Sequence, residues 1–101
     1  MGGFQREQPE PGSPPMPGMA TSRRLKELEQ ASGRDAEVRF LRLMIAHHQA
    51  GVRMAEAALG LSDDPQVRRM ATSMVAAQQS EIGLMKRMLV ARGENERTQS
   101  P

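Results

Sequence analysis

Two adjacent histidines, His47 and His48, stand in the middle of the segment FLRLMIAHHQAGVRMA, residues 40–55. Methionines lie close by on either side, Met44 before the pair and Met54 after it. Imidazole nitrogen suits copper, zinc, iron and nickel, whereas thioether sulfur specifically favours copper(I). The residue types of this segment therefore raise three possibilities: metal ligands, catalytic groups, or histidines that are hydrogen-bonded in a core.

A second segment places polar residues on a methionine-rich helical face. The residues on this face recur at steps of three and four, which is the spacing of one side of a helix. Two of them, Gln78 and Glu81, stand where the pattern otherwise has apolar side chains. An unpaired carboxylate is costly to bury, so we expect Glu81 to have a partner. The face comprises Met70, Met74, Gln78, Glu81, Met85 and Met88.

The donor set favours copper over other metals. A carboxylate with two imidazoles suits zinc or iron, but nine methionines in the chain shift the expectation to copper. A methionine stripe at helical spacing is also the ordinary pattern of core packing, and Glu81 is equally suited to fix a histidine tautomer or to pair with a structural histidine. The candidate metal ligands are Glu37, Met44, His47, His48, Met54, Gln78, Glu81 and Met85.

The same residues give little support to catalysis, and we expect no enzyme. A His–Glu pair can transfer protons, but no inward serine or threonine stands beside it as a nucleophile. Adjacent histidines point about 100° apart on a helix, so they do not chelate one ion as an i, i+4 pair does. A ferritin-like di-metal oxidase would need more inward carboxylates than Glu37 and Glu81. One ring is therefore expected to bind within its own hairpin and the other across a dimer interface.

Helix signals predict the elements that position these residues, and no strand pattern occurs. Thr21 or Ser22 can cap a short helix that Gly33 ends. Asp35 is the expected cap of a long helix, residues 35–60, with Gly60 as its left-handed exit.

A second long helix completes the predicted hairpin. Asp64 is its expected cap and Pro65 its first residue, and it runs to about Arg92 and stops at Gly93. The tight connection makes the two long helices antiparallel. We divide the chain into a Pro/Gly-rich leader (1–20), a helical domain (21–93) and a polar tail (94–101).

Composition limits the core and the partners. The all-α unit is small, has only two aromatic residues for its core, and has no cysteines to form disulfides. Small units of this kind often gain stability by associating, so we expect self-association. The histidines lie in an apolar arc roughly 200° wide, broader than one neighbour needs. Dimerisation into a four-helix bundle would supply further neighbours. Lys and Arg (14) nearly balance Asp and Glu (12), which argues against nucleic-acid binding, and no apolar run reaches the length of a transmembrane segment.

The combined motif resembles the bacterial family called domain of unknown function 305. The matching features are a Met-Ile-x-His-His block, a downstream Met-Ala pair, and Gln-x-x-Glu-Ile-x-x-Met in the second long helix. Members often have Phe-Asp where this chain has Ala36 and Glu37, so Glu37 keeps a carboxylate with a longer reach. The residues that carry the resemblance are Met44, Ile45, His47, His48, Met54, Ala55, Gln78, Glu81, Ile82 and Met85.

The resemblance implies a ferritin-like helical fold, export to the periplasm, envelope or exterior, and copper binding as in some members. The leading hypothesis is thus an exported copper buffer or carrier. The alternative is a non-catalytic dimerisation or interaction module with a methionine-rich core and structural histidines. Chelators should leave the melting temperature of such a module unchanged, whereas loss of a bound metal should lower it.

Overall fold

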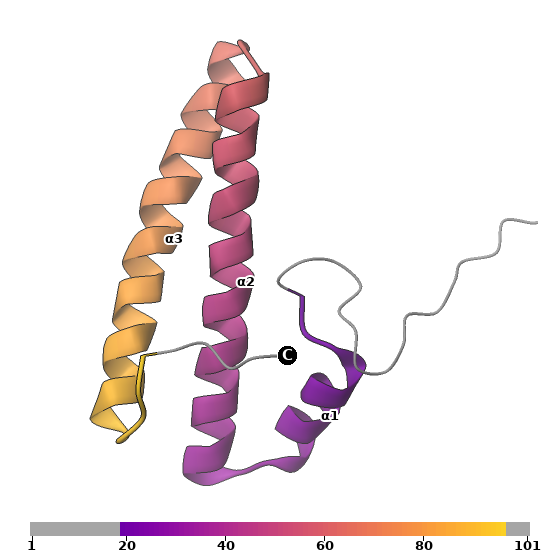
Figure 1. The fold of residues 1–101 in the computed structure, drawn as a ribbon, viewed down its shortest axis with the longest axis vertical. Coiled ribbons are helices and arrows are strands. Elements are labelled where there is room, and N and C mark those ends of the chain that lie inside the picture. The colour runs from indigo at the N-terminus through magenta and orange to yellow at the C-terminus, as the bar shows by residue number, and fades with distance from the viewer. Residues whose placement is uncertain (1–18, 97–101) are drawn as a thin grey trace, which may run out of the picture.

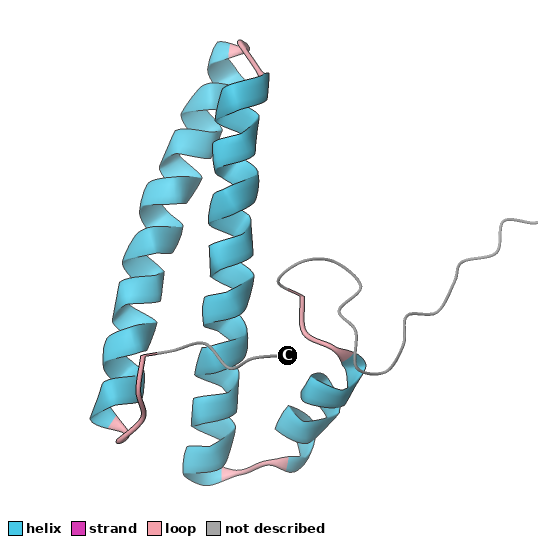
Figure 2. Ribbon diagram, in the orientation of Figure 1, coloured by secondary structure: helices cyan, strands magenta, loops and turns pink. Residues whose placement is uncertain are grey.

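The computed structural model describes residues 19–96, and this part of the chain consists of three helices without a strand (Figure 2). Helix α1 spans Ser22–Gln30, α2 spans Gly33–Leu61 and α3 spans Pro65–Ala91. The two long helices run antiparallel and side by side, and α1 lies beside α2 on the side away from α3 (Figure 1). The predicted all-α hairpin preceded by a short helix is therefore confirmed. Most of the leader (1–18) and the last residues of the tail (97–101) lie outside the described residues.

Helix α1 begins and ends through local hydrogen bonds. The hydroxyl of Thr21 accepts the Arg24 N–H at 3.1 Å, so Thr21 is the N-cap. The helix ends at Gln30, and the extended residue Ala31 is its C-cap. The predicted end at Gly33 was wrong: Gly33 has φ of 59° and is the first residue of α2, where its left-handed conformation turns the chain between the helices.

The predicted end of α2 at about Gly60 is confirmed within a residue, but its predicted start and the left-handed exit at Gly60 need correction. Its N-cap is the extended residue Ser32, and Asp35 lies inside the first turn, where its carboxylate pairs with Arg39 at 3.0 Å. The helix continues through Gly60 to Leu61, and Gly60 has no positive φ. The Ser62 N–H closes the last turn on the Ala58 carbonyl, so no left-handed glycine is needed there.

The predicted ends of α3 are confirmed within a residue. Asp64 accepts the N–H groups of Gln66 and Val67 at 2.9 and 3.0 Å, and Pro65 follows as the first helical residue. At the other end Gly93 has φ of 81°, and the Glu94 N–H bonds to the Leu89 carbonyl. This pattern is a Schellman motif, which satisfies the last carbonyls of the helix.

The core is concentrated in the half of the hairpin distant from the Ser62–Asp64 connection. Its cluster is Leu41, Ile45, Met85 and Leu89, with Ile45 and Leu89 fully buried. Towards the connection the buried residues become small, as at Ala55 and Ala71, so the two helices are held there by less apolar surface. No helix within residues 19–96 is long and apolar enough to cross a membrane.

Ion pairs close the open end of the hairpin. Glu94 accepts from Arg34 at 2.7 Å and from Arg42 at 2.8 Å, and Glu37 pairs with Arg92 at 2.9 Å. The two hydrogen bonds from the arginines hold the pKa of Glu94 below its ordinary value. Glu94 is therefore part of the folded unit, although the sequence placed it in the polar tail.

Candidate functional site

The His48 ring forms the central polar contact between α2 and α3. Its Nδ1 lies 2.8 Å from the backbone carbonyl of Met44, and its Nε2 lies 2.5 Å from Oε1 of Glu81. The imidazole is largely buried, with 13% of its side chain exposed, whereas the Glu81 side chain is 60% exposed. The predicted partner of Glu81 is thus His48, and the pair lies at the edge of the hairpin rather than in its core.

The hydrogen bonds of His48 restrict its protonation. A carbonyl oxygen only accepts, so Nδ1 must carry a proton to bond Met44. Nε2 then faces a carboxylate, which also only accepts when ionised. The contact with Glu81 is favourable if Nε2 carries a second proton or if Glu81 is protonated, because one of the two groups must then donate a hydrogen bond. The pair is consequently a short hydrogen bond that becomes an ion pair when His48 carries both ring protons.

His47 points in a different direction from His48. Its ring is exposed, and the two ring centroids are 6.2 Å apart with planes at 65°. The predicted divergence of the two imidazoles is therefore observed, and the pair does not converge on one point within the chain.

Gln78, one turn before Glu81, contacts the backbone of α2 at Gly51. A Cβ added at Gly51 would lie 3.0 Å from the Gln78 side-chain carbonyl carbon and closer still to its amide atoms. The absence of a side chain at Gly51 therefore makes room for the Gln78 amide. His48–Glu81 and Gly51–Gln78 bridge the two helices at neighbouring levels.

The remaining candidates are spread along the hairpin. Met85 is buried in the core, and Met44 is partly buried against it. Met54 is 63% exposed. Glu37 lies at the open end, where it pairs with Arg92. Within residues 19–96 no three His, Asp or Glu side chains are grouped so as to hold a metal ion.

The apolar arc of α2 is only half covered by α3. The line of α2 that packs on α3 passes through Leu41, Ile45 and Val52, which are buried. The line through Phe40, His47 and Met54 lies about 100–140° away and is exposed. The sequence correctly predicted a wide arc, but it centred the arc on His47, whereas the hairpin covers the side of His48.

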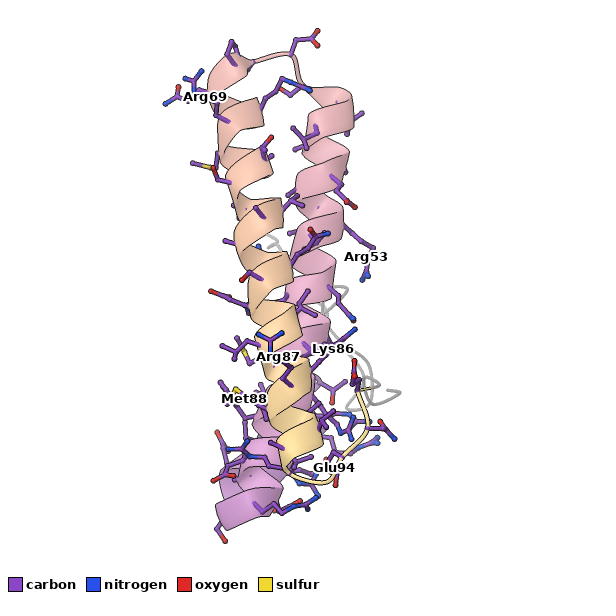
Figure 3. The ribbon with its side chains drawn as sticks, turned by 90° about the vertical axis from the view of Figure 1, so that its left-hand side faces the viewer. Arg53, Arg69, Lys86, Arg87, Met88 and Glu94 are labelled. Carbon is purple, nitrogen blue, oxygen red and sulfur yellow. The ribbon has the colours of Figure 1, made fainter. Side chains whose placement is uncertain are left out.

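Helix α3 presents a matching exposed line on the same side of the hairpin. His48 and Gly51, at the edge of the exposed line of α2, contact Glu81 and Gln78 at the edge of that of α3, so the two lines adjoin. In Figure 3 Met88 lies on this side, and Arg53 and Lys86 lie on the other. We call this surface the open face; its exposed members are Phe40, His47, Met54, Met70, Met74, Ala77, Glu81 and Leu84, and the partly buried Met88 borders it.

The opposite side of the hairpin is polar and basic. A shallow groove there is lined by residues that include Gln49, Arg53 and Gln79, and Lys86 lies on the same side (Figure 3). The sequence did not predict this groove, because the two amides gain significance only once the register of α2 against α3 is known.

The fold and site define a small helical-hairpin protein with a histidine–glutamate pair between its long helices and an apolar, methionine-rich side. Residues 2–89 match the family model described as Domain of unknown function (DUF305). The chain belongs to the DUF305 family.

A solved structure supports this assignment. The chain is 41% identical to a protein described as "putative secreted protein DUF305 from Streptomyces coelicolor", with a TM-score of 0.79. The match covers 85% of this chain and 53% of the related one, so this chain spans about half the length of its relative. No functionally curated protein matches the chain.

Proposed function

We propose that this protein is an exported, non-catalytic metal-binding protein that holds copper(I) as a buffer or carrier. The observation that carries the proposal is the orientation of His48: its Nδ1 donates to the Met44 carbonyl, and this bond directs Nε2 toward Glu81. A hydrogen bond from the other ring nitrogen to a carbonyl is how proteins fix metal-binding histidines. The Met44–His48 geometry is therefore suited to a ligand.

The residues around this pair favour copper(I) over zinc or iron. Zinc and iron sites draw on several imidazole and carboxylate groups, and no three such side chains converge within residues 19–96. Thioethers are more abundant on this side, including Met54, Met70 and Met74 on the open face. Copper(I) accepts thioether and imidazole together, so it fits the available donors best. His48 and Glu81 would hold the ion, with His47, Met44, Met54, Met85, Gln78 and Glu37 as the further candidates. Export is proposed from the description of the Streptomyces coelicolor relative as secreted.

Anaerobic titration of the metal-free protein with copper(I), in competition with a chromophoric chelator, tests the proposal. We expect binding tighter than micromolar and a loss of more than about 10-fold in affinity for His48→Ala, since even the groups that orient a ligand contribute that much. His47→Ala in combination with His48→Ala should lose more. Gln49→Ala, on the other side of the hairpin, is the matched control and should bind as the wild type does. Binding no tighter than micromolar, or a double variant with unchanged affinity, would refute the proposal.

A second candidate function is an interaction module in which His48 is structural. It is favoured by the fact that both ring nitrogens of His48 already have protein partners. In that case copper(I) or a chelator leaves the melting temperature unchanged. A metal that binds the folded state selectively raises the melting temperature by mass action, so thermal unfolding with and without copper(I) separates the two functions.

A further inference from the structure

The open face is too apolar to be ordinary surface. Phe40, Met54, Met70, Met74 and Leu84 are 44–64% exposed on one side of two adjacent helices. Single exposed apolar residues are common on protein surfaces, but a contiguous patch of large ones marks an interaction site. The face therefore requires an occupant.

The hairpin itself has little core to stabilise it alone. Its buried cluster contains four large side chains, and only Ile45 and Leu89 are fully buried. Units of this size without disulfides usually need a metal or association to add buried surface. A second hairpin on the open face would bring the number of long helices around the apolar arc of α2 from two to four.

Charge decides which side of the hairpin can meet a copy of itself. On the helical projection, Glu81 is the one carboxylate on the open face among the described residues, and it already contacts His48. Arg69 lies on the same side, at the end of α3 near the Ser62–Asp64 connection (Figure 3), so the middle parts of two open faces can meet without strong like-charge repulsion. The opposite side carries Arg53 and Lys86. If two chains met through this side, the cations of one chain would repel those of the other.

The dimensions also fit. The open face is two helices wide, roughly 20 Å, and runs about 30 Å from the level of Phe40 to that of Leu61. It offers about 600 Å² per copy, so two copies would bury about 1,200 Å², which reaches the size of specific interfaces.

We propose that a second copy of this chain covers the open face, forming a two-fold symmetric four-helix bundle. The interface is self-complementary, as two-fold dimers require. Ala77 lies near the middle of the face, where its small side chain lets the helices of the two copies approach closely. This inference goes beyond the proposed function and does not rest on it, because apolar contact alone drives the association.

Sedimentation equilibrium in a chelator-containing buffer tests the dimer without metal. We expect the wild type to have twice the 11.1 kDa mass of one chain at micromolar concentration. Met54→Glu combined with Met74→Glu should give a helical monomer by circular dichroism. Gln49→Glu combined with Gln79→Glu adds the same charges to the other side and should stay dimeric. A monomeric wild type overturns the proposal, and so does a charge variant of the open face that remains dimeric.

Cross-linking provides a test that does not depend on how the charged variant folds. The chain has no cysteine, so Ala77→Cys introduces a single thiol near the middle of the open face. A short bismaleimide reagent should link two such chains covalently in high yield. Ala76→Cys, one residue away and about 100° around the helix, should remain unlinked in the same reaction. Equal cross-linking yields for the two variants would contradict the dimer. So would a cross-link from the introduced cysteine to another part of a longer polypeptide, or to another protein, in place of a second copy.

Discussion

Nε2 of His48 lies 2.5 Å from Oε1 of Glu81, and this contact joins the middle of α2 to the middle of α3. The His48 ring is largely buried and Glu81 is more than half exposed, so the contact lies at the boundary between the hairpin's core and its open face. Any cation at His48 must compete with or include Glu81. The proposed metal site and the packing of the hairpin would therefore share one pair of atoms.

Removing this pair should destabilise the hairpin modestly. Because Glu81 is solvent-exposed, we expect Glu81→Gln to cost about 0.5–1 kcal/mol of unfolding free energy at neutral pH. His48→Gln should cost more, since it also removes the hydrogen bond from the ring to the Met44 carbonyl. Urea unfolding of both single variants and the double variant gives their coupling energy. A coupling energy of zero would show that the two side chains do not interact in solution.

The hairpin itself was predictable from the sequence, because its signals are local. Asp64 followed by Pro65 and the stop at Gly93 act within one turn of each helix end. The predicted start of α2 at Asp35 was wrong because the chain turns at Gly33, whose positive φ lets the helix begin there with Ser32 as its N-cap, and Asp35 pairs with Arg39 instead of capping. Local capping rules do not reveal such competition.

The side of α2 that faces α3 was not predictable. Because the apolar arc of α2 is about 200° wide, α3 could pack either on its His47 side or on its His48 side. Only the register of α3 against α2 decides between the two. The ion pairs of Glu94 depend on the same register, which brings residues more than fifty positions apart together. The metal, export and the dimer stay predictions.

The close contact of Gly51 with Gln78 should appear as energetic coupling. Alanine favours helix over glycine by up to about 1 kcal/mol, but a Cβ at Gly51 must displace the Gln78 amide. We therefore expect Gly51→Ala to be more stabilising in a Gln78→Ala background than in the wild type. Chemical denaturation of the four proteins measures the difference. Gly60→Ala, where a Cβ meets no atom, is the control and should show no dependence on Gln78.

The ion pairs of Glu94 predict a loss of stability in acid. Hydrogen bonds from Arg34 and Arg42 lower the pKa of Glu94 from its ordinary value of 4.5. The unfolded chain then binds a proton at higher pH than the folded chain does, so this contribution is fully present above pH 4.5 and is lost as the pH falls through the lower folded value. Melting temperatures of the wild type and Glu94→Gln should differ at pH 7 and converge in acid. A difference that is independent of pH would contradict the assignment.

Core truncation should reveal how little apolar surface holds the hairpin together. Leu89 is fully buried in the four-residue cluster, and Leu→Ala changes in cores cost about 2–5 kcal/mol. Since a unit of this size has few kcal/mol in total, we expect Leu89→Ala to be largely unfolded at 25 °C, as judged by the helical signal in circular dichroism. Ile45→Val removes one methylene from the same cluster and should stay folded, at a cost of about 0.5–1.5 kcal/mol. Val90→Ala, at a position that is 52% exposed beside Leu89, is the matched control and should melt close to the wild type. A fully folded Leu89→Ala would mean that contacts outside this cluster supply most of the stability.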